Sequence, residues 1–241
     1  MVAISGGKDS TAMALRLREL YPSRAFSFVI TITGDELPPM LAHWADLESR
    51  LGSAFIRLYC TAGREPIGLL DLIRAERMIP NFRARFCTRM LKIEPFFTYL
   101  GSLVGPSAWY SGLRADEETR GGIIHELPEV SIIYPLQDWG WGLADVEQYL
   151  AEVGVVIPAR TDCGACFFQR LPEWKALLLE YPDRYAEYEA IEAEIGYTFR
   201  SDRRDTWPAG LKELRLAFES GRPLRNWSRK RKELHCSWCA R

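Results

Sequence analysis

The segment SGGKDS at residues 5–10 contains the residue types that point most directly to chemistry. It follows a short apolar run, Met1–Ile4, and precedes a helical pattern in residues 10–20. Glycines let backbone N–H groups approach phosphate oxygens, and the start of a helix adds the positive end of its dipole. The glycine spacing differs from that of a Walker A loop. We predict a nucleotide phosphate loop, and its binding residues are Ser5, Gly6, Gly7, Lys8, Asp9 and Ser10.

Two arginines follow a glycine in the middle of the chain. Arg114 and Arg120 lie two and eight residues after Gly112. The forked guanidinium group suits phosphate or sulfate recognition. The residues alone also fit a solvent-exposed arginine pair beside Glu117 and Glu118, and without further information that alternative is the stronger one.

The cysteines form two C-x-x-C pairs that lie far apart in the chain. They are Cys163 with Cys166, and Cys236 with Cys239. Two such pairs predict a four-cysteine site for zinc or an iron–sulfur cluster. The alternative is that one pair binds nothing or forms a redox dithiol. Cys60 ends an apolar run and is interpreted as a buried, small apolar side chain.

Five sequence motifs, given in chain order at the end of this paragraph, resemble those of the PP-loop ATP pyrophosphatases, the adenine nucleotide alpha-hydrolase-like superfamily. Within it the chain resembles the phosphoadenosine phosphosulfate (PAPS) reductase family. Two departures stand out: Ile32 replaces an aspartate of the second motif, and Phe86 and Thr88 flank Cys87 where a double cysteine is usual. The motifs are SGGKDS at 5–10, TGDELP at 33–38, RFCT with LKIEP at 85–95, GLRADE at 112–117, and PLQDW at 135–139 followed by CGAC at 163–166.

The resemblance implies how the nucleotide is bound. The loop would hold the phosphates of ATP or of an adenylyl sulfate (APS or PAPS), and Thr33 and Gly34 would lie near the ribose or adenine. Arg114 and Arg120 would reach the anionic end of the substrate. The full set of residues expected to bind the nucleotide adds Thr33, Gly34, Gly112 and Arg114 to the loop, and the expected catalytic residues are Lys8, Asp9, Arg114 and Arg120.

The complete loop favours one reaction over another. Members that cleave ATP between the α and β phosphates keep SGG-x-DS, so the resemblance implies ATP cleavage to AMP and pyrophosphate, with Mg²⁺ assisting, to adenylate or sulfurate a substrate. The first alternative is a sulfonucleotide reductase that releases sulfite, with Cys239 near the C-terminus as its nucleophile. The second is a nucleic-acid-binding partner subunit with a vestigial nucleotide pocket.

The resemblance also implies a cysteine-bound cluster. In iron–sulfur members, a cysteine in the segment of Cys87 and the later C-x-x-C pair both hold a [4Fe–4S] cluster. We expect four of five thiols to bind, with iron–sulfur preferred and zinc as the alternative. The remaining thiol would act as a sulfur carrier or as a reductant, and the expected partners include a thiol reductant or a sulfur donor. The five expected ligands are Cys87, Cys163, Cys166, Cys236 and Cys239.

The elements that would position these groups alternate in the first half of the chain. Strand-like runs at residues 25–33 and 54–59 flank a helical pattern at 39–51. This alternation predicts an α/β fold, a doubly wound and mostly parallel sheet with helices on both faces. Helical patterns at 143–153, at 172–196 with an interruption at Pro182, and at 211–218 predict a helical C-terminal extension containing cysteines. We divide the chain into a nucleotide-binding core, 1–135, and this extension, 136–241.

Composition bounds the remaining possibilities. The 241 residues are 47% hydrophobic and 26% charged, which excludes a wholly disordered chain. The net charge of −1 excludes a protein that coats nucleic acid through bulk charge. There is no apolar run of about 18 residues and no signal-peptide pattern, so we expect a cytoplasmic protein. Residues 222–232 are strongly basic around Trp227, which fits either nucleic-acid binding or a solvated tail.

Overall fold

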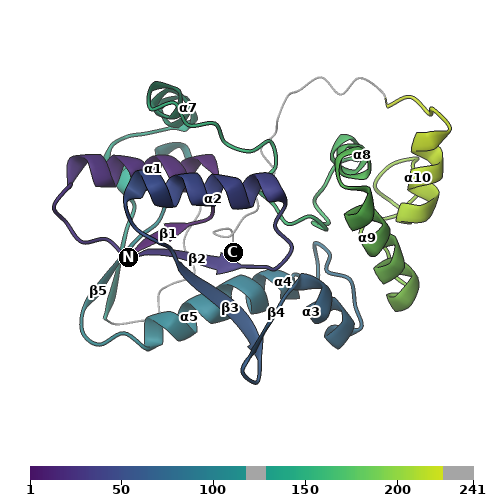
Figure 1. The fold of residues 1–241 in the computed structure, drawn as a ribbon, viewed down its shortest axis with the longest axis horizontal. Helices are drawn as coiled ribbons and strands as arrows, with labels where there is room; N and C mark the ends of the chain where they lie inside the picture. The colour runs from purple at the N-terminus through teal and green to yellow at the C-terminus, as the bar shows by residue number, and fades with distance from the viewer. Residues whose placement is uncertain (118–128, 225–241) are drawn as a thin grey trace.

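The computed structural model describes residues 1–117 and 129–224 (Figure 1). Within them the strands form one sheet in the order β4-β3-β2-β1-β5-β6. All neighbouring strands are parallel except β3 and β4, which form an antiparallel pair. This sheet confirms the predicted α/β fold class. The strands are β1 (Val2–Ile4), β2 (Phe28–Ile32), β3 (Ile56–Ala62), β4 (Glu65–Ile67), β5 (Ser107–Tyr110) and β6 (Val130–Ile133).

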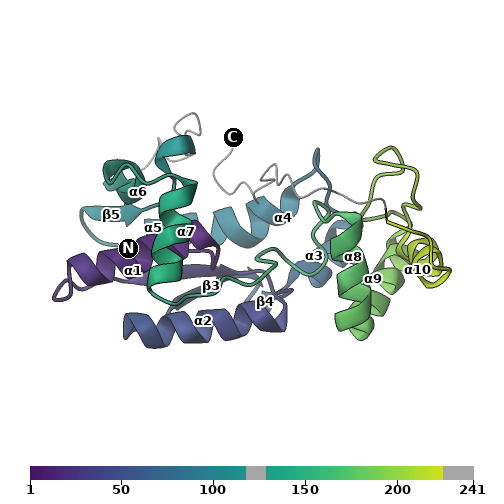
Figure 2. The ribbon, with the colours of Figure 1, turned by 90° about the horizontal axis from the view of Figure 1, so that it is seen from above.

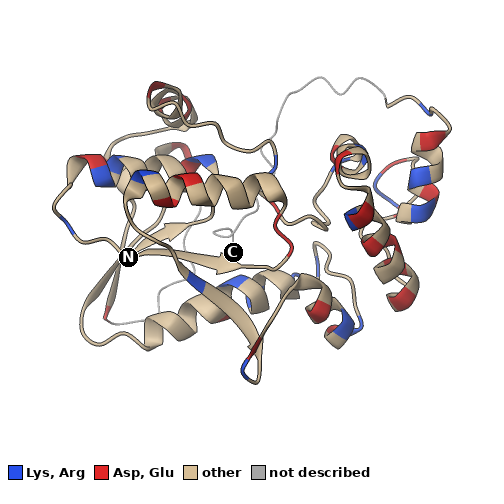
Figure 3. Cartoon of the chain, viewed as in Figure 1, with Lys and Arg blue, Asp and Glu red and all other residues tan. Residues whose placement is uncertain are grey.

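Helices cover both faces of the sheet. On one face lie α1 (Lys8–Leu20), α2 (Pro38–Leu51) and α7 (Leu143–Glu152), and on the other lies α5 (Glu94–Gly101) (Figure 1). The side chains of β2 alternate between the two faces. Phe28 and Ile30 pack on the face covered by α1, α2 and α7, and Val29 packs on the other face with Phe96 of α5 and Trp109 of β5. Figure 3 shows charged residues on the helices, on β3 and in loops, but none on β1 or β2, as central strands buried on both faces require.

The C-terminal helices form a second apolar cluster. Figure 2 shows α8, α9 and α10 gathered at one end of the molecule beside α3. Trp174, Tyr185 and Leu214 pack there with Leu72. The buried Glu192 carboxylate of α9 accepts two backbone N–H groups, one from Phe199 and one from Leu211, the first residue of α10. These bonds link α9 to α10. The remaining helices are α3 (Leu69–Glu76), α4 (Phe86–Thr88), the π-helix η1 (Arg89–Ile93), the 3-10 helix η2 (Ala115–Glu117), α6 (Pro135–Asp138), α8 (Leu171–Glu180), α9 (Pro182–Ile195) and α10 (Leu211–Glu219).

The helical C-terminal region is therefore confirmed. The helical pattern at 172–196 is divided where the interruption was predicted: α8 ends before Tyr181, and Pro182 starts α9. The division of the chain at residue 135 stays a prediction, and α7, which follows it, packs on α1 in the same apolar cluster as β1 and β2. No helix within 1–117 and 129–224 is long and apolar enough to span a bilayer.

The strand order places the predicted loop at a favourable position. Strand β1 pairs with β2 on one side and with β5 on the other. The order of strands therefore reverses at β1, and ligands of open α/β sheets bind at the carboxyl ends of the strands where this happens. The carboxyl end of β1 leads directly into residues 5–10.

Candidate functional site

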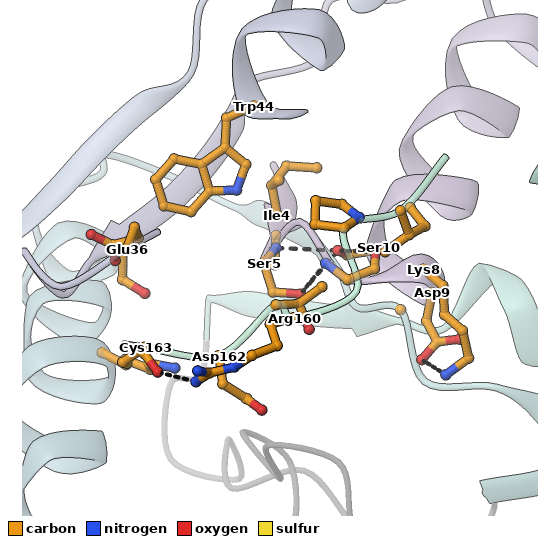
Figure 4. A pocket seen from close by; sticks show the side chains of 18 of the residues that line it. Ile4, Ser5, Lys8, Asp9, Ser10, Glu36, Trp44, Arg160, Asp162 and Cys163 are labelled. Atoms are coloured by element: carbon orange, nitrogen blue, oxygen red, sulfur yellow. Dashed lines mark hydrogen bonds and ion pairs between the residues drawn. The ribbon is translucent and has the colours of Figure 1, made fainter. Parts of the chain in front are cut away.

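A pocket of about 720 Å³ opens at the carboxyl ends of β1, β2 and β5 (Figure 4). Its floor is the loop at residues 5–10, and the coil at residues 155–163 forms another wall. Seven of the ten residues predicted to bind the nucleotide line it, whereas Gly6, Gly34 and Arg114 do not. Arg120 lies outside the described residues. The seven are Ser5, Gly7, Lys8, Asp9, Ser10, Thr33 and Gly112.

Hydrogen bonds fold the loop back onto the first turn of α1. The Ser5 and Ser10 hydroxyl oxygens are 3.0 Å apart, and the Ser5 N–H donates to the Ser10 hydroxyl at 3.2 Å. The Gly7 N–H in turn donates to the Ser5 hydroxyl at 3.3 Å. Gly6 has a φ of +79°, in the left-handed region that favours glycine. This arrangement presents the N-terminus of α1 to the pocket, as anion binding at a helix start requires.

Gly112 brings the segment after β5 against the start of α1. A Cβ atom at this position would lie 3.1 Å from the Ser10 backbone nitrogen and 3.2 Å from the Asp9 carbonyl carbon. Backbone atoms cannot move aside as a flexible side chain can, so a larger residue here would push the two segments apart. The glycine is therefore needed for the close approach of two strand ends that form the pocket.

Arg114 lies buried behind the loop and bonds to the protein's own carboxylates. Its side chain is only 3% exposed. One terminal nitrogen is 3.1 Å from both carboxylate oxygens of Asp9, and Nε donates to Asp116 at 2.8 Å. Glu117 is 3.6 Å away. Burial disfavours its charge, but the carboxylates outweigh this effect and raise the pKa of Arg114. This burial excludes the solvent-exposed alternative for Arg114. The two contacts with the Asp9 carboxylate indicate that the Arg114 guanidinium holds that carboxylate in position.

A residue that the sequence interpretation gave no role, Asp35, joins the pocket to the C-x-x-C turn. Its side chain is fully buried. One carboxylate oxygen accepts the Tyr188 hydroxyl at 2.5 Å, and the other accepts the Ala165 N–H at 2.7 Å. Its backbone carbonyl accepts the Gly164 N–H at 2.7 Å. Burial raises the pKa of Asp35 to about 6, and the bond from Tyr188 opposes the rise. Its place in the TGDELP motif was the available signal.

The cysteines predicted as ligands fall partly within the structure. Cys163 lines the pocket, and the Cys166 N–H donates to the Cys163 carbonyl at 3.2 Å in a tight turn. Cys87 and Cys163 pack against the same apolar cluster. Cys236 and Cys239 lie outside the described residues. In the part of the chain that the structure describes, no group of three or more Cys, His, Asp or Glu residues is arranged to hold a metal ion.

Comparisons with known proteins agree with this fold. No curated protein matches the chain in sequence. The solved structure of phosphoadenylyl-sulfate (PAPS) reductase from Candida auris, in a phosphate complex, is similar with a TM-score of 0.50. The similarity covers 64% of this chain and 72% of that chain at 14% identity, and it supports the fold alone. The chain also matches the family described as the phosphoadenosine phosphosulfate reductase domain over residues 1–159. That match covers more than half of the sequence and confirms the resemblance: the chain belongs to the phosphoadenosine phosphosulfate reductase domain family.

Proposed function

We propose that the pocket binds an adenine nucleotide and that the protein cleaves ATP to AMP and pyrophosphate, to adenylate or sulfurate a substrate. One observation carries this proposal. The complete loop at residues 5–10 lies at the start of α1, at the point where the strand order reverses, and lines a pocket large enough for a nucleotide. Family membership supports an enzyme that handles sulfonucleotides or related adenine nucleotides.

In this reaction a nucleophile of the acceptor attacks the α phosphorus, and the bond from that phosphorus to the bridging oxygen breaks. Pyrophosphate leaves with the electron pair of that bond, and the acceptor is adenylated. AMP leaves when a sulfur nucleophile or water then displaces it from the acceptor. Lys8 and the N-terminus of α1 would stabilise the charge on the phosphates. Arg114 would fix the carboxylate of Asp9 at the edge of the pocket. A carboxylate there, together with phosphate oxygens, is a donor set that suits Mg²⁺, which would neutralise phosphate charge.

A sulfonucleotide reductase is the second candidate, favoured by the family and by Cys163, which lines the same pocket as the loop. In that reaction a cysteine thiolate attacks the sulfur of APS or PAPS, the sulfur–oxygen bond breaks, and the nucleotide leaves with the electron pair. A second thiolate then attacks the cysteine sulfur, a disulfide forms and sulfite departs. A thiol reductant would restore the two thiols. Cys239, the predicted nucleophile, lies outside the described residues.

One assay separates these functions from the third, a nucleic-acid-binding subunit. Purified protein is incubated with ATP, or with APS or PAPS and a dithiol reductant. AMP and pyrophosphate from ATP would support the first proposal, and sulfite would support the second. Nucleotide binding without either product would favour the binding subunit. Of its basic tail, 222–232, only residues 222–224 are described, and Arg222 packs over Trp207 at 4.4 Å.

We further propose that four of the five cysteines named above hold a [4Fe–4S] cluster, with zinc as the alternative. Cys163 and Cys166 are expected to bind in either case, because a C-x-x-C turn lets two thiolates face one metal centre. The support is that Cys163 and Cys87 pack against the same apolar cluster, and that Cys166 follows Cys163 in a tight turn. An iron–sulfur cluster would supply thiolate-bound iron beside the pocket.

Metal analysis after anaerobic purification tests this centre. We expect a brown protein that contains iron and sulfide, and Cys163→Ser should lose both. Cys60→Ser is the matched control and should keep the metal, because Cys60 is not among the expected ligands. One equivalent of zinc would overturn the cluster but keep the ligands. Protein without metal, whose stability Cys163→Ser leaves unchanged, would contradict both versions.

A further inference from the structure

Arg160 brings a guanidinium group to the wall of the pocket that the coil at residues 155–163 forms. The residue is half-buried, and none of the sequence motifs gives it a role. In the view of Figure 4 it lies between Ser5 of the loop and Cys163, with its guanidinium toward Cys163. Its position in the pocket makes it a candidate for contact with the ligand, and its hydrogen bonds indicate which ligand group suits it.

Two neutral acceptors hold this guanidinium in place. One terminal nitrogen donates to the side-chain oxygen of Gln169 at 2.8 Å, and the other donates to the Cys163 carbonyl at 2.6 Å. Gln169 is itself only 3% exposed, and its amide nitrogen donates to the Gly164 carbonyl. A buried side chain therefore fixes Arg160 against the C-x-x-C turn, so little conformational freedom is left to lose when a ligand binds.

The protein uses only part of the binding capacity of this guanidinium. The two contacts occupy two of its N–H groups, and the others have no acceptor among the described residues. In the same part of the chain no carboxylate forms an ion pair with Arg160, whereas Arg170, which lines the same pocket, pairs with Glu173 at 2.7 Å. Arg160 therefore keeps donors and a positive charge that no contacting carboxylate neutralises.

The loop that forms the floor of the pocket suits the same kind of ligand. It offers backbone N–H groups, the positive end of the α1 dipole and Lys8, whose charge Asp9 partly compensates at 3.5 Å. A guanidinium on a second wall adds forked donors, which match the oxygens of a phosphate or sulfate group. The two walls together fit a tetrahedral oxyanion better than a neutral group.

We propose that Arg160 binds a phosphate or sulfate group of the nucleotide and holds that group on the Cys163 side of the pocket. This inference rests on the proposed binding of an adenine nucleotide. Because the same guanidinium donates to the Cys163 carbonyl, the bound anion and the C-x-x-C turn share one cation. Arg160 thereby helps to determine which nucleotides bind, separately from the loop at residues 5–10.

Two substitutions of Arg160 test the contact. Arg160→Gln keeps a donor without the charge, and Arg160→Lys keeps the charge without the forked donors. Arg170→Gln is the matched control, because it removes the same charge from the same pocket, but from a guanidinium that is already paired with Glu173. Calorimetry gives the affinities for ATP, APS and AMP, after thermal unfolding shows that the variants are folded.

We expect Arg160→Gln to bind ATP or APS about tenfold more weakly, as the loss of a hydrogen bond to a charged group requires. Arg160→Lys and Arg170→Gln should each lose no more than about threefold. An equal loss for AMP would assign the contact to the α phosphate. Unchanged AMP binding would assign it to the outer phosphates if ATP is affected, and to the sulfate if APS is affected.

Unchanged affinities in Arg160→Gln would overturn the inference. So would a loss that Arg160→Lys matches, because the effect would then come from the contacts with the turn and not from the charge, and a loss that Arg170→Gln matches, because any cation of the pocket would then serve. If the unchanged protein bound none of the three nucleotides, the proposed function would fail together with the inference.

Discussion

Replacing Arg114 with alanine is expected to lower the free energy of unfolding by about 1.5–3 kcal/mol, the range for hydrogen bonds to charged groups. The side chain is 3% exposed and contacts three carboxylates. Its loss would remove the guanidinium that Asp9, Asp116 and Glu117 share, although Asp9 would keep Lys8 at 3.5 Å. An exposed loop arginine would cost only about 0.5 kcal/mol.

Denaturant unfolding measures this effect, with Arg16→Ala as a control. Arg16 pairs with Glu19 on the exposed surface of α1 and should contribute less than about 1 kcal/mol. Arg114→Lys keeps the charge but not the forked contacts, so its loss should fall between the two. A change below 1 kcal/mol for Arg114→Ala would contradict the structural role that we assign to this residue.

The second large effect is expected at Asp35. Asp35→Ala should destabilise the fold by about 2–4 kcal/mol, because the Tyr188 hydroxyl and the Ala165 N–H would lose their buried acceptor. It should also release the turn that carries Cys163 and Cys166, so these thiols should be alkylated faster by a thiol reagent. Denaturant unfolding and mass spectrometry of the alkylated peptides measure the two effects.

Two milder variants test the cause. Tyr188→Phe removes only the hydroxyl contact, and Asp35→Asn keeps the shape of the side chain. Both should destabilise less than Asp35→Ala, by about 1–2 kcal/mol. If Asp35→Ala unfolded like the unchanged protein, or left the alkylation rate of Cys163 unaltered, the proposed link between β2 and the C-x-x-C turn would be wrong.

The sequence predicted the elements that depend on local pattern. The apolar run at 25–33 contains β2, and the glycine loop follows β1 as expected. Some boundaries differ from the prediction, and the strand expected at 54–59 is Ile56–Ala62. Leu20 has the spacing of the buried face of α1, but it lies at the end of the helix and is 41% exposed. Periodicity identifies a face, but it does not say where the neighbouring element stops covering it.

The features of the site that the sequence did not predict are contacts between distant segments, including those of residues that it did identify, such as Arg114. Arg114, which follows β5, is buried where it meets Asp9 of α1, whose carboxylate is 3.1 Å from the guanidinium group. Asp35 meets Tyr188 of α9 and a turn near residue 165. No local spacing encodes these pairings, so the sequence alone could not predict them.

We propose above that the pocket at residues 5–10 binds an adenine nucleotide. Calorimetric titration of the purified protein with ATP, APS and PAPS tests it most directly, with Lys8→Ala as the variant that removes the loop's cation. We expect saturable binding of at least one of the three, weakened in Lys8→Ala. A folded protein that binds none of them, or a Lys8→Ala variant that binds as tightly as the unchanged protein, would contradict this account of the site.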